Sequence, residues 1–105
     1  MQYYSTNGKA SLASLEKAVV KALAEDKGLY MPESIKTLPA AFFKNIGGLS
    51  LQEIAYAVAD SLFGEDVDAD VLKRIVYDAL NFDMPLHKVA DRRYCLELYH
   101  GPTLA

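Results

Sequence analysis

The sequence contains no tryptophan, one cysteine, and no apolar run near the roughly 18 residues that a membrane-spanning helix needs. Its N-terminus, MQYYSTNGK, lacks the charged and apolar regions of a secretory signal. Cys95 has no partner for a disulfide within the chain, which favours a reducing compartment. There is no run of five or more basic residues, and the formal net charge is -3. We therefore expect a cytoplasmic protein that binds neither nucleic acid nor a membrane.

Recognisable metal-binding motifs are also missing. The stretch DVDAD, residues 66–70, has the acidic spacing that opens a calcium-binding loop. Val71 and Tyr77 stand where that loop requires glycine and glutamate, so we interpret the acids as the start of a helix, where the helix dipole favours negative charge. His87 and His100 have no second histidine or cysteine at zinc-site spacing. The pattern therefore predicts no metal centre.

Nucleophilic and phosphate-binding motifs give no stronger signal. Cys95 lies in an alternating stretch, which predicts a small buried hydrophobic residue rather than an activated thiol. The sequence NGK at residues 7–9 lacks the remaining features of a phosphate-binding loop and predicts a turn. Taken alone, the residues indicate no convincing active site.

What the sequence does contain is typical of a globular domain. Hydrophobic residues make up 51% and charged residues 24% of the 105 positions, a balance that predicts a buried core. A compact domain of this length has a radius of gyration of about 13 Å.

Periodicity predicts a small, helix-rich α+β domain with about four helices and short strands at its edges. Ser14 is the expected N-cap of the first helix, with Gly28 as its stop, and Ser50 and Glu53 form a capping box for the third. Apolar stripes predict a buried face on the first, third and fourth helices. The expected strands are residues 1–5, 29–32, 84–90 and 94–99, and the expected helices are residues 14–28, 37–48, 50–62 and 68–82.

Four segments of the chain resemble the N-terminal part of threonine synthase. They are YYSTNG near the start, LYMPE after the first helix, LSLQEIA at the third helix and LELYHGPTLA at the end. Residues 26–32 also follow the family pattern Asp-x-Gly-Leu-Tyr-x-Pro, and the similarity runs in order over residues 2–105.

This resemblance implies a pyridoxal-phosphate enzyme that converts O-phosphohomoserine and water to threonine and phosphate. In that family the lysine that forms the Schiff base lies in a Phe-Lys-Asp segment directly after Leu-Ala. We therefore expect the chain to stop just short of its catalytic lysine, to hold neither catalytic nor cofactor-binding residues, and to be inactive alone. The expected partner is the remainder of the polypeptide, a doubly wound catalytic domain. Residues 1–93 would form the N-terminal domain, and residues 94–105 the first segment of the catalytic one.

The polar, family-matching positions outside the helices are expected to line one side of the substrate cleft. They are Ser5, Thr6, Asn7, His100 and Thr103. Two positions depart from the family pattern, since Asn7 stands where arginine is common and Lys27 where glycine is common.

The alternative interpretation comes from a different class of protein. The amphipathic helices and the lack of a complete site are also compatible with a free-standing helical module that binds a partner protein through an apolar groove. The reading frame beyond Ala105 discriminates between the two.

Overall fold

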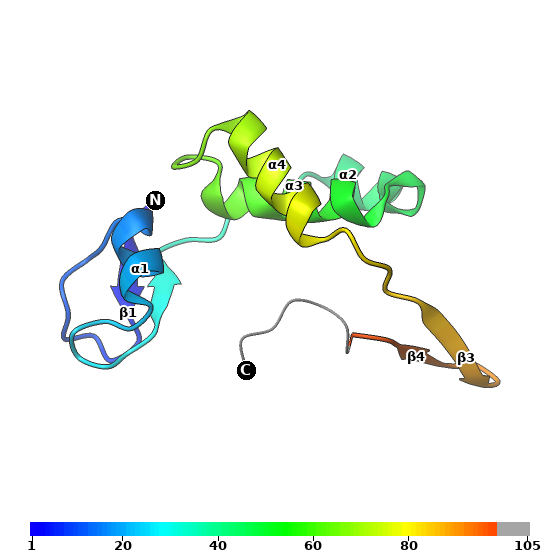
Figure 1. The fold of residues 1–105 in the computed structure, drawn as a ribbon, viewed down its shortest axis with the longest axis horizontal. Coiled ribbons are helices and arrows are strands. Elements are labelled where there is room, and N and C mark those ends of the chain that lie inside the picture. The colour runs from blue at the N-terminus through cyan, green and yellow to red at the C-terminus, as the bar shows by residue number, and fades with distance from the viewer. Residues whose placement is uncertain (99–105) are drawn as a thin grey trace.

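The computed structural model describes residues 1–98 and contains the elements in the predicted order (Figure 1). This order confirms the predicted α+β class with four α-helices and short strands in the described part of the chain. The elements are β1 (Tyr3–Ser5), α1 (Leu15–Lys21), β2 (Tyr30–Pro32), α2 (Ala40–Asn45), the 3-10 helix η1 (Ile46–Gly48), α3 (Leu51–Phe63), α4 (Ala69–Ala79), β3 (Leu86–Ala90) and β4 (Arg93–Leu96).

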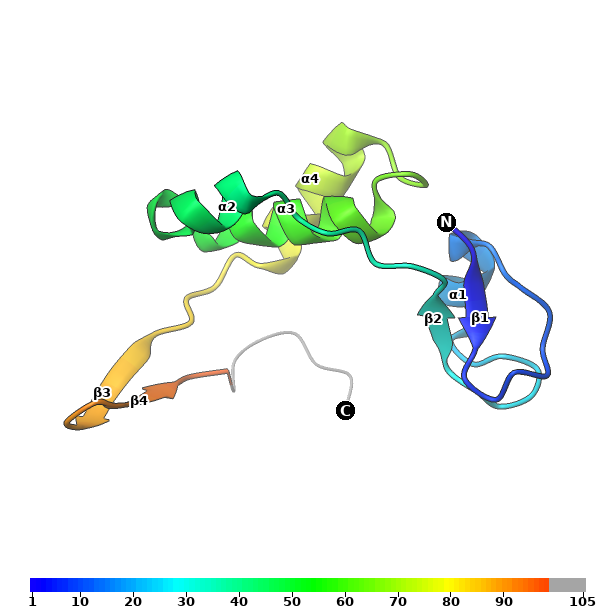
Figure 2. The same cartoon turned by 180° about the vertical axis from the view of Figure 1, so that it is seen from behind.

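The first part of the chain forms a small unit around two antiparallel strands. β1 pairs with β2, with Tyr3 opposite Pro32 and Ser5 opposite Tyr30. Tyr3 and Ser5 alternate with the exposed Tyr4, so β1 has one buried face. α1 lies over this two-stranded sheet in both views (Figures 1 and 2). The unit buries a small core that also includes Ala13 and Ala24.

The helix α1 is shorter than the sequence predicts. Ser14 caps it as expected, its hydroxyl accepting from the amide of Lys17 at 3.2 Å. The predicted stop at Gly28 is wrong, because the helix ends at Lys21 and Ala22 takes a positive φ of 62°. The chain then turns back, and the amide of Ala24 bonds the carbonyl of Gly28 at 3.0 Å. Because residues 23–29 fold back in this way, the helix does not continue beyond Lys21.

The predicted buried face of α1 is also wrong. Val19 and Leu23, both on the predicted stripe, are 69% and 51% exposed, and the neighbouring Val20 is 79% exposed. The short helix therefore presents an apolar surface that no described element covers.

The second unit is helical. Ser50 and Glu53 form the predicted capping box at the start of α3, and Asp68 caps α4 by accepting from the amide of Asp70 at 3.2 Å. The acids at residues 66–70 therefore mark a helix start, as interpreted. α3 and α4 pack against each other, but only Leu72 and Val76 of α4 are buried, and α3 has no fully buried residue.

The third unit is the hairpin of β3 and β4, in which Leu86 pairs with Leu96 and His87 with Cys95. Every residue of both strands is exposed, and the hairpin lies apart from the helices in both views (Figures 1 and 2). The prediction that Cys95 is buried is therefore wrong, because no described element covers this hairpin. The expected domain boundary after residue 93 falls at the start of β4.

The arrangement of the three units makes the molecule extended. Its radius of gyration is 16.7 Å, larger than the compact value expected from its length, and its dimensions are 49 × 29 × 25 Å. In residues 1–98 no helix is both long and apolar enough to span a bilayer.

Candidate functional site

A polar cluster joins two segments that lie about 20 residues apart in sequence. They are residues 5–10, at the end of β1 and in the loop after it, and residues 26–29, in the loop before β2. At its centre is the carboxylate of Asp26. Oδ1 accepts hydrogen bonds from the hydroxyl of Ser5 at 2.5 Å and from the amide of Gly28 at 3.0 Å. Oδ2 accepts from the amides of Lys9 and Ala10, both at 2.9 Å. Four donors from both loops therefore converge on one side chain.

The neighbouring polar side chains fasten the same two loops. The side-chain amide of Asn7 donates to the carbonyl of Asp26 at 2.9 Å. The hydroxyl of Thr6 accepts from the amide of Leu29 at 2.9 Å, and the amide of Thr6 donates to the carbonyl of Leu29 at the same distance. We call the set formed by Ser5, Thr6, Asn7 and Asp26 the loop clamp.

The backbone around the loop clamp has two special positions. A Cβ atom added at Gly28 would collide with the hydroxyl of Ser5 and lie 2.9 Å from the amide nitrogen of Asn7, so only glycine allows this close approach. Lys27 adopts a φ of 66°, in the left-handed region that glycine favours. This conformation explains physically why glycine suits position 27.

Hydrogen bonding controls the charge of Asp26. The donor hydroxyl of Ser5, followed by the amides of Gly28, Lys9 and Ala10, lowers the pKa of the carboxyl to about 2, although partial desolvation opposes this shift. Asp26 is therefore ionised at neutral pH, and the hydroxyl and amide donors stabilise its negative charge.

The structure brings together the three predicted site residues that it describes. Ser5 is only 2% exposed and its hydroxyl is engaged by Asp26, whereas Thr6 and Asn7 are exposed at the loop surface. His100 and Thr103 lie outside the described residues. Sequence reasoning missed Asp26 as a structural centre, and the signal that could have found it is the Asp-x-Gly turn at residues 26–28.

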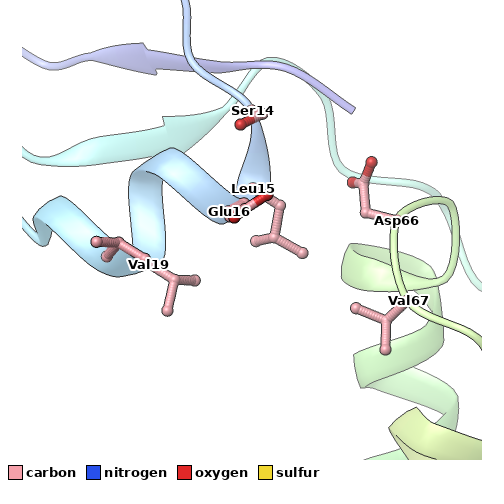
Figure 3. Close-up of a pocket in the computed structure, with 7 residues that line it drawn as sticks. Ser14, Leu15, Glu16, Val19, Asp66 and Val67 are labelled. Atoms are coloured by element: carbon pink, nitrogen blue, oxygen red, sulfur yellow. The ribbon is translucent and has the colours of Figure 1, made fainter.

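A pocket of about 450 Å³ lies between the start of α1 and the loop that precedes α4 (Figure 3). Leu15 and Val19 face it from α1, and Val67 and Asp66 from the opposite side. Its charged lining residues, Glu16 and Asp66, are both acidic, so the pocket does not suit a phosphate-bearing ligand. Nowhere in residues 1–98 do three His, Cys, Asp or Glu side chains gather closely enough to hold a metal ion.

The described residues form an α+β domain in which the polar side chains of the loop clamp hold two loops together. A family model described as "Threonine synthase N terminus" matches residues 2–80. The chain belongs to this family.

Relatives and solved structures agree with this family. A threonine synthase from Schizosaccharomyces pombe is 38% identical over 112 aligned residues, covering 100% of this chain and 22% of the relative. The structure of a PLP-bound threonine synthase from Brucella melitensis has a TM-score of 0.85 and 34% identity, and that of the Escherichia coli threonine synthase has a TM-score of 0.86 and 26% identity. Both alignments cover 100% of this chain and 24% of the solved chain. The chain therefore spans about a quarter of the length of these proteins.

Proposed function

We propose that this chain is the N-terminal part of a pyridoxal-phosphate-dependent threonine synthase, which converts O-phosphohomoserine and water to threonine and phosphate in the cytoplasm. The observation that carries the proposal is the match to the family model over residues 2–80. In addition, threonine synthases about four times as long as this chain align with the whole of it. The fold similarity to the Brucella melitensis and Escherichia coli enzymes supports it.

We expect no pyridoxal-phosphate site among the described residues. Lys17, Lys21 and Lys36 are engaged in surface ion pairs with carboxylates, at 3.1, 3.3 and 2.9 Å respectively. The described pocket beside α1 has acidic rather than basic charged residues. We therefore assign the cofactor, its lysine and the chemistry to residues beyond this chain, and assign to this chain a part in enclosing the cleft.

A comparison of two polypeptides tests this function. The longer polypeptide, with the residues that follow Ala105 in the reading frame, should release phosphate and form threonine from O-phosphohomoserine when pyridoxal phosphate is present. The 105-residue chain should form none. A folded longer polypeptide that binds the cofactor but leaves this substrate unchanged would contradict the proposal.

Within this function, the loop at residues 5–8 and the segment at residues 100–103 line one side of the cleft. The loop clamp supports this role for the first of them, because it fixes an exposed polar turn whose Thr6 and Asn7 reach solvent. The buried Ser5 would act indirectly, by holding Asp26 and the turn in place.

Alanine variants of the longer polypeptide test the cleft. Asn7→Ala should lower kcat/KM, because the turn loses the hydrogen bond from the Asn7 amide to the carbonyl of Asp26, at 2.9 Å, that holds it in place. Asn45→Ala is the matched control, because Asn45 also donates to a backbone carbonyl at 2.9 Å but lies on α2. His100→Ala and Thr103→Ala should lower kcat or raise KM. Unchanged kinetics in all three cleft variants would remove this part of the proposal.

The free-standing interaction module remains the alternative. An apolar groove of about 410 Å³ between α3 and α4, lined by residues such as Val58, Leu62 and Ile75, favours it. A stop codon directly after Ala105 would support the module. A Phe-Lys-Asp segment followed by several hundred residues of alternating strands and helices would support the enzyme.

A further inference from the structure

Asn7 and Gly8 form a pair of residues that occurs once in this chain. The asparagines are Asn7, Asn45 and Asn81, and only Asn7 is followed by glycine. The backbone nitrogen of a glycine can reach the side-chain carbonyl carbon of a preceding asparagine, because no Cβ hinders the approach. Isoleucine follows Asn45 and phenylalanine follows Asn81, and both side chains crowd the corresponding nitrogen. Asn7 is therefore the asparagine most prone to react with its own backbone.

The reaction of such a pair is deamidation. The backbone nitrogen of Gly8 forms a bond to Cγ of Asn7 and closes a succinimide ring. The bond from Cγ to the side-chain nitrogen breaks, and this nitrogen takes the proton of the Gly8 amide and leaves as ammonia. Water then opens the ring at either carbonyl, which gives aspartate or isoaspartate at position 7. The overall step consumes water and releases ammonia, so it needs no enzyme and no redox partner.

In the folded protein both nitrogens of this reaction are hydrogen-bonded elsewhere. The attacking nitrogen, the amide of Gly8, donates to the carbonyl of Ser5 at 2.9 Å. The leaving nitrogen, the side-chain amide of Asn7, donates to the carbonyl of Asp26 at 2.9 Å. The attack brings the Gly8 nitrogen onto the Asn7 side chain, so these two hydrogen bonds have to open first.

The loop clamp keeps the two hydrogen bonds closed from both sides. The hydroxyl of Ser5 accepts from the amide of Asn7 at 3.2 Å. On the other side, Asp26 accepts from the amides of Lys9 and Ala10, directly after the Asn-Gly pair. Both residues of the pair are exposed, so water reaches them and burial does not protect them. Protection therefore depends on the hydrogen bonds of the clamp.

We propose that Asn7 is a site of spontaneous deamidation and that the loop clamp sets its rate. The rate in the folded protein is the fraction of molecules with an open loop multiplied by the rate of the free Asn-Gly pair. The product weakens the clamp, because aspartate at position 7 lacks the donor to the carbonyl of Asp26 and places a second acceptor near it.

Deamidation also adds a negative charge to a turn that the proposed function places at the substrate cleft. This consequence rests on the proposed function, in which the substrate carries a phosphate that a carboxylate repels. In the longer polypeptide, Asn7→Asp should raise the KM for O-phosphohomoserine more than Asn7→Ala. Both variants lose the amide donor, and only aspartate adds the charge. Equal KM values for the two variants would overturn this consequence.

Peptide mass mapping of the longer polypeptide during storage at neutral pH measures the modification. In guanidinium chloride, Asn7 should convert to aspartate and isoaspartate, while Asn45 in the same digest should stay intact. In the folded protein the conversion of Asn7 should be at least about tenfold slower. An Asn7 that stays intact in guanidinium chloride, or that converts equally fast in both states, would overturn the proposal.

Two variants distinguish the clamp from overall stability. Ser5→Ala removes the donor to Asp26 and the acceptor for the amide of Asn7, so it should speed the conversion about fivefold. Ser50→Ala removes the cap of α3, outside the clamp, and should leave the rate at Asn7 unchanged. Equal acceleration by both variants would overturn the role of the clamp.

A milder clamp variant covers the case in which Ser5→Ala does not fold. Thr6→Val removes only the hydroxyl that accepts from the amide of Leu29, and it should also speed the conversion of Asn7. An unchanged rate in a folded Thr6→Val protein would then overturn the role of the clamp.

Failure of this inference can be separated from failure of the proposed function. A longer polypeptide that forms threonine while its Asn7 converts equally fast folded and unfolded would overturn only the deamidation proposal. A folded polypeptide that protects Asn7 but does not act on O-phosphohomoserine would overturn only the proposed function.

Discussion

At the level of single residues, Asp26 makes the contacts that hold the two loops of the first unit together. Its carboxylate meets donors from residues 5–10, and its carbonyl meets the side chain of Asn7. The loop that the family resemblance associates with the cleft therefore depends on a residue about 20 positions away. The sequence predicted the turn at residues 7–9, but it placed residues 26–28 at the end of the first helix and did not show that the two segments meet.

The ionisation of Asp26 makes this unit sensitive to acid. The folded protein holds the pKa of Asp26 at about 2, whereas an unfolded aspartate has a pKa of about 3.9. The folded state therefore binds this proton more weakly, so the stabilising contribution is complete above about pH 5 and is lost as the pH falls from about 4 toward 2. Asp26→Asn should flatten the dependence of Tm on pH in this window.

The control for this prediction is Ser5→Ala, which removes the largest cause of the shift but keeps the carboxylate. It should raise the pKa of Asp26 in an NMR titration. This account of the loop clamp would be contradicted if Ser5→Ala left the pKa of Asp26 unchanged. It would also be contradicted if the Tm of Asp26→Asn depended on pH as strongly as that of the unsubstituted protein.

Two adjacent positions in the same turn should respond in opposite directions. Gly28→Ala should destabilise the protein by about 1–3 kcal/mol, because the added Cβ meets Ser5 and the backbone of Asn7. Lys27→Gly should stabilise it by about 0.5–1 kcal/mol, because glycine adopts the positive φ without strain. Chemical denaturation of the two variants measures both effects. A stabilising Gly28→Ala or a destabilising Lys27→Gly would show that the turn has a different conformation.

At the level of elements, the sequence predicted best what is set by near neighbours. The N-caps at Ser14 and Ser50 depend on residues three positions away, and both are confirmed. The predicted end of α1 was wrong, because the true end depends on residues 23–29, which fold back on themselves, and on the distant loop clamp. The antiparallel pairing of β1 with β2 could not be predicted, because it joins strands separated by more than 20 residues.

The capping box of α3 gives a prediction at this scale. Ser50→Ala should lower the free energy of unfolding by about 1 kcal/mol, because the amide of Glu53 loses its acceptor at 3.1 Å. Glu53→Gln should have a smaller effect, because glutamine also completes a capping box with the amide of Ser50. Chemical denaturation measures both variants. If Ser50→Ala proves as stable as the unsubstituted chain, the cap does not limit the stability of this unit.

At the level of the whole molecule, composition predicted a compact core that the described residues do not form. The fully buried hydrophobic residues of residues 1–98 are Tyr3, Ala13, Ala24, Leu72 and Val76. Large apolar side chains on α1, on α3 with α4, and on the hairpin are left exposed instead. Periodicity identified the apolar stripes of the first, third and fourth helices, but it cannot tell whether the element that covers a face belongs to the same domain.

The candidate site, like the core, could be predicted from the sequence only in part. The resemblance directed attention to Ser5, Thr6 and Asn7, and the structure brings these residues together with Asp26. It describes neither His100 nor Thr103, so their place in the cleft stays a prediction. The cofactor chemistry was predicted from the family pattern alone, and its place outside this chain stays a prediction.

Titration with pyridoxal phosphate, followed by its absorbance, tests most directly whether the chemistry resides outside this chain. The longer polypeptide should show a saturable, stoichiometric change together with threonine formation, and the 105-residue chain should show neither. Stoichiometric cofactor binding by the 105-residue chain, or turnover of O-phosphohomoserine by it alone, would contradict the account.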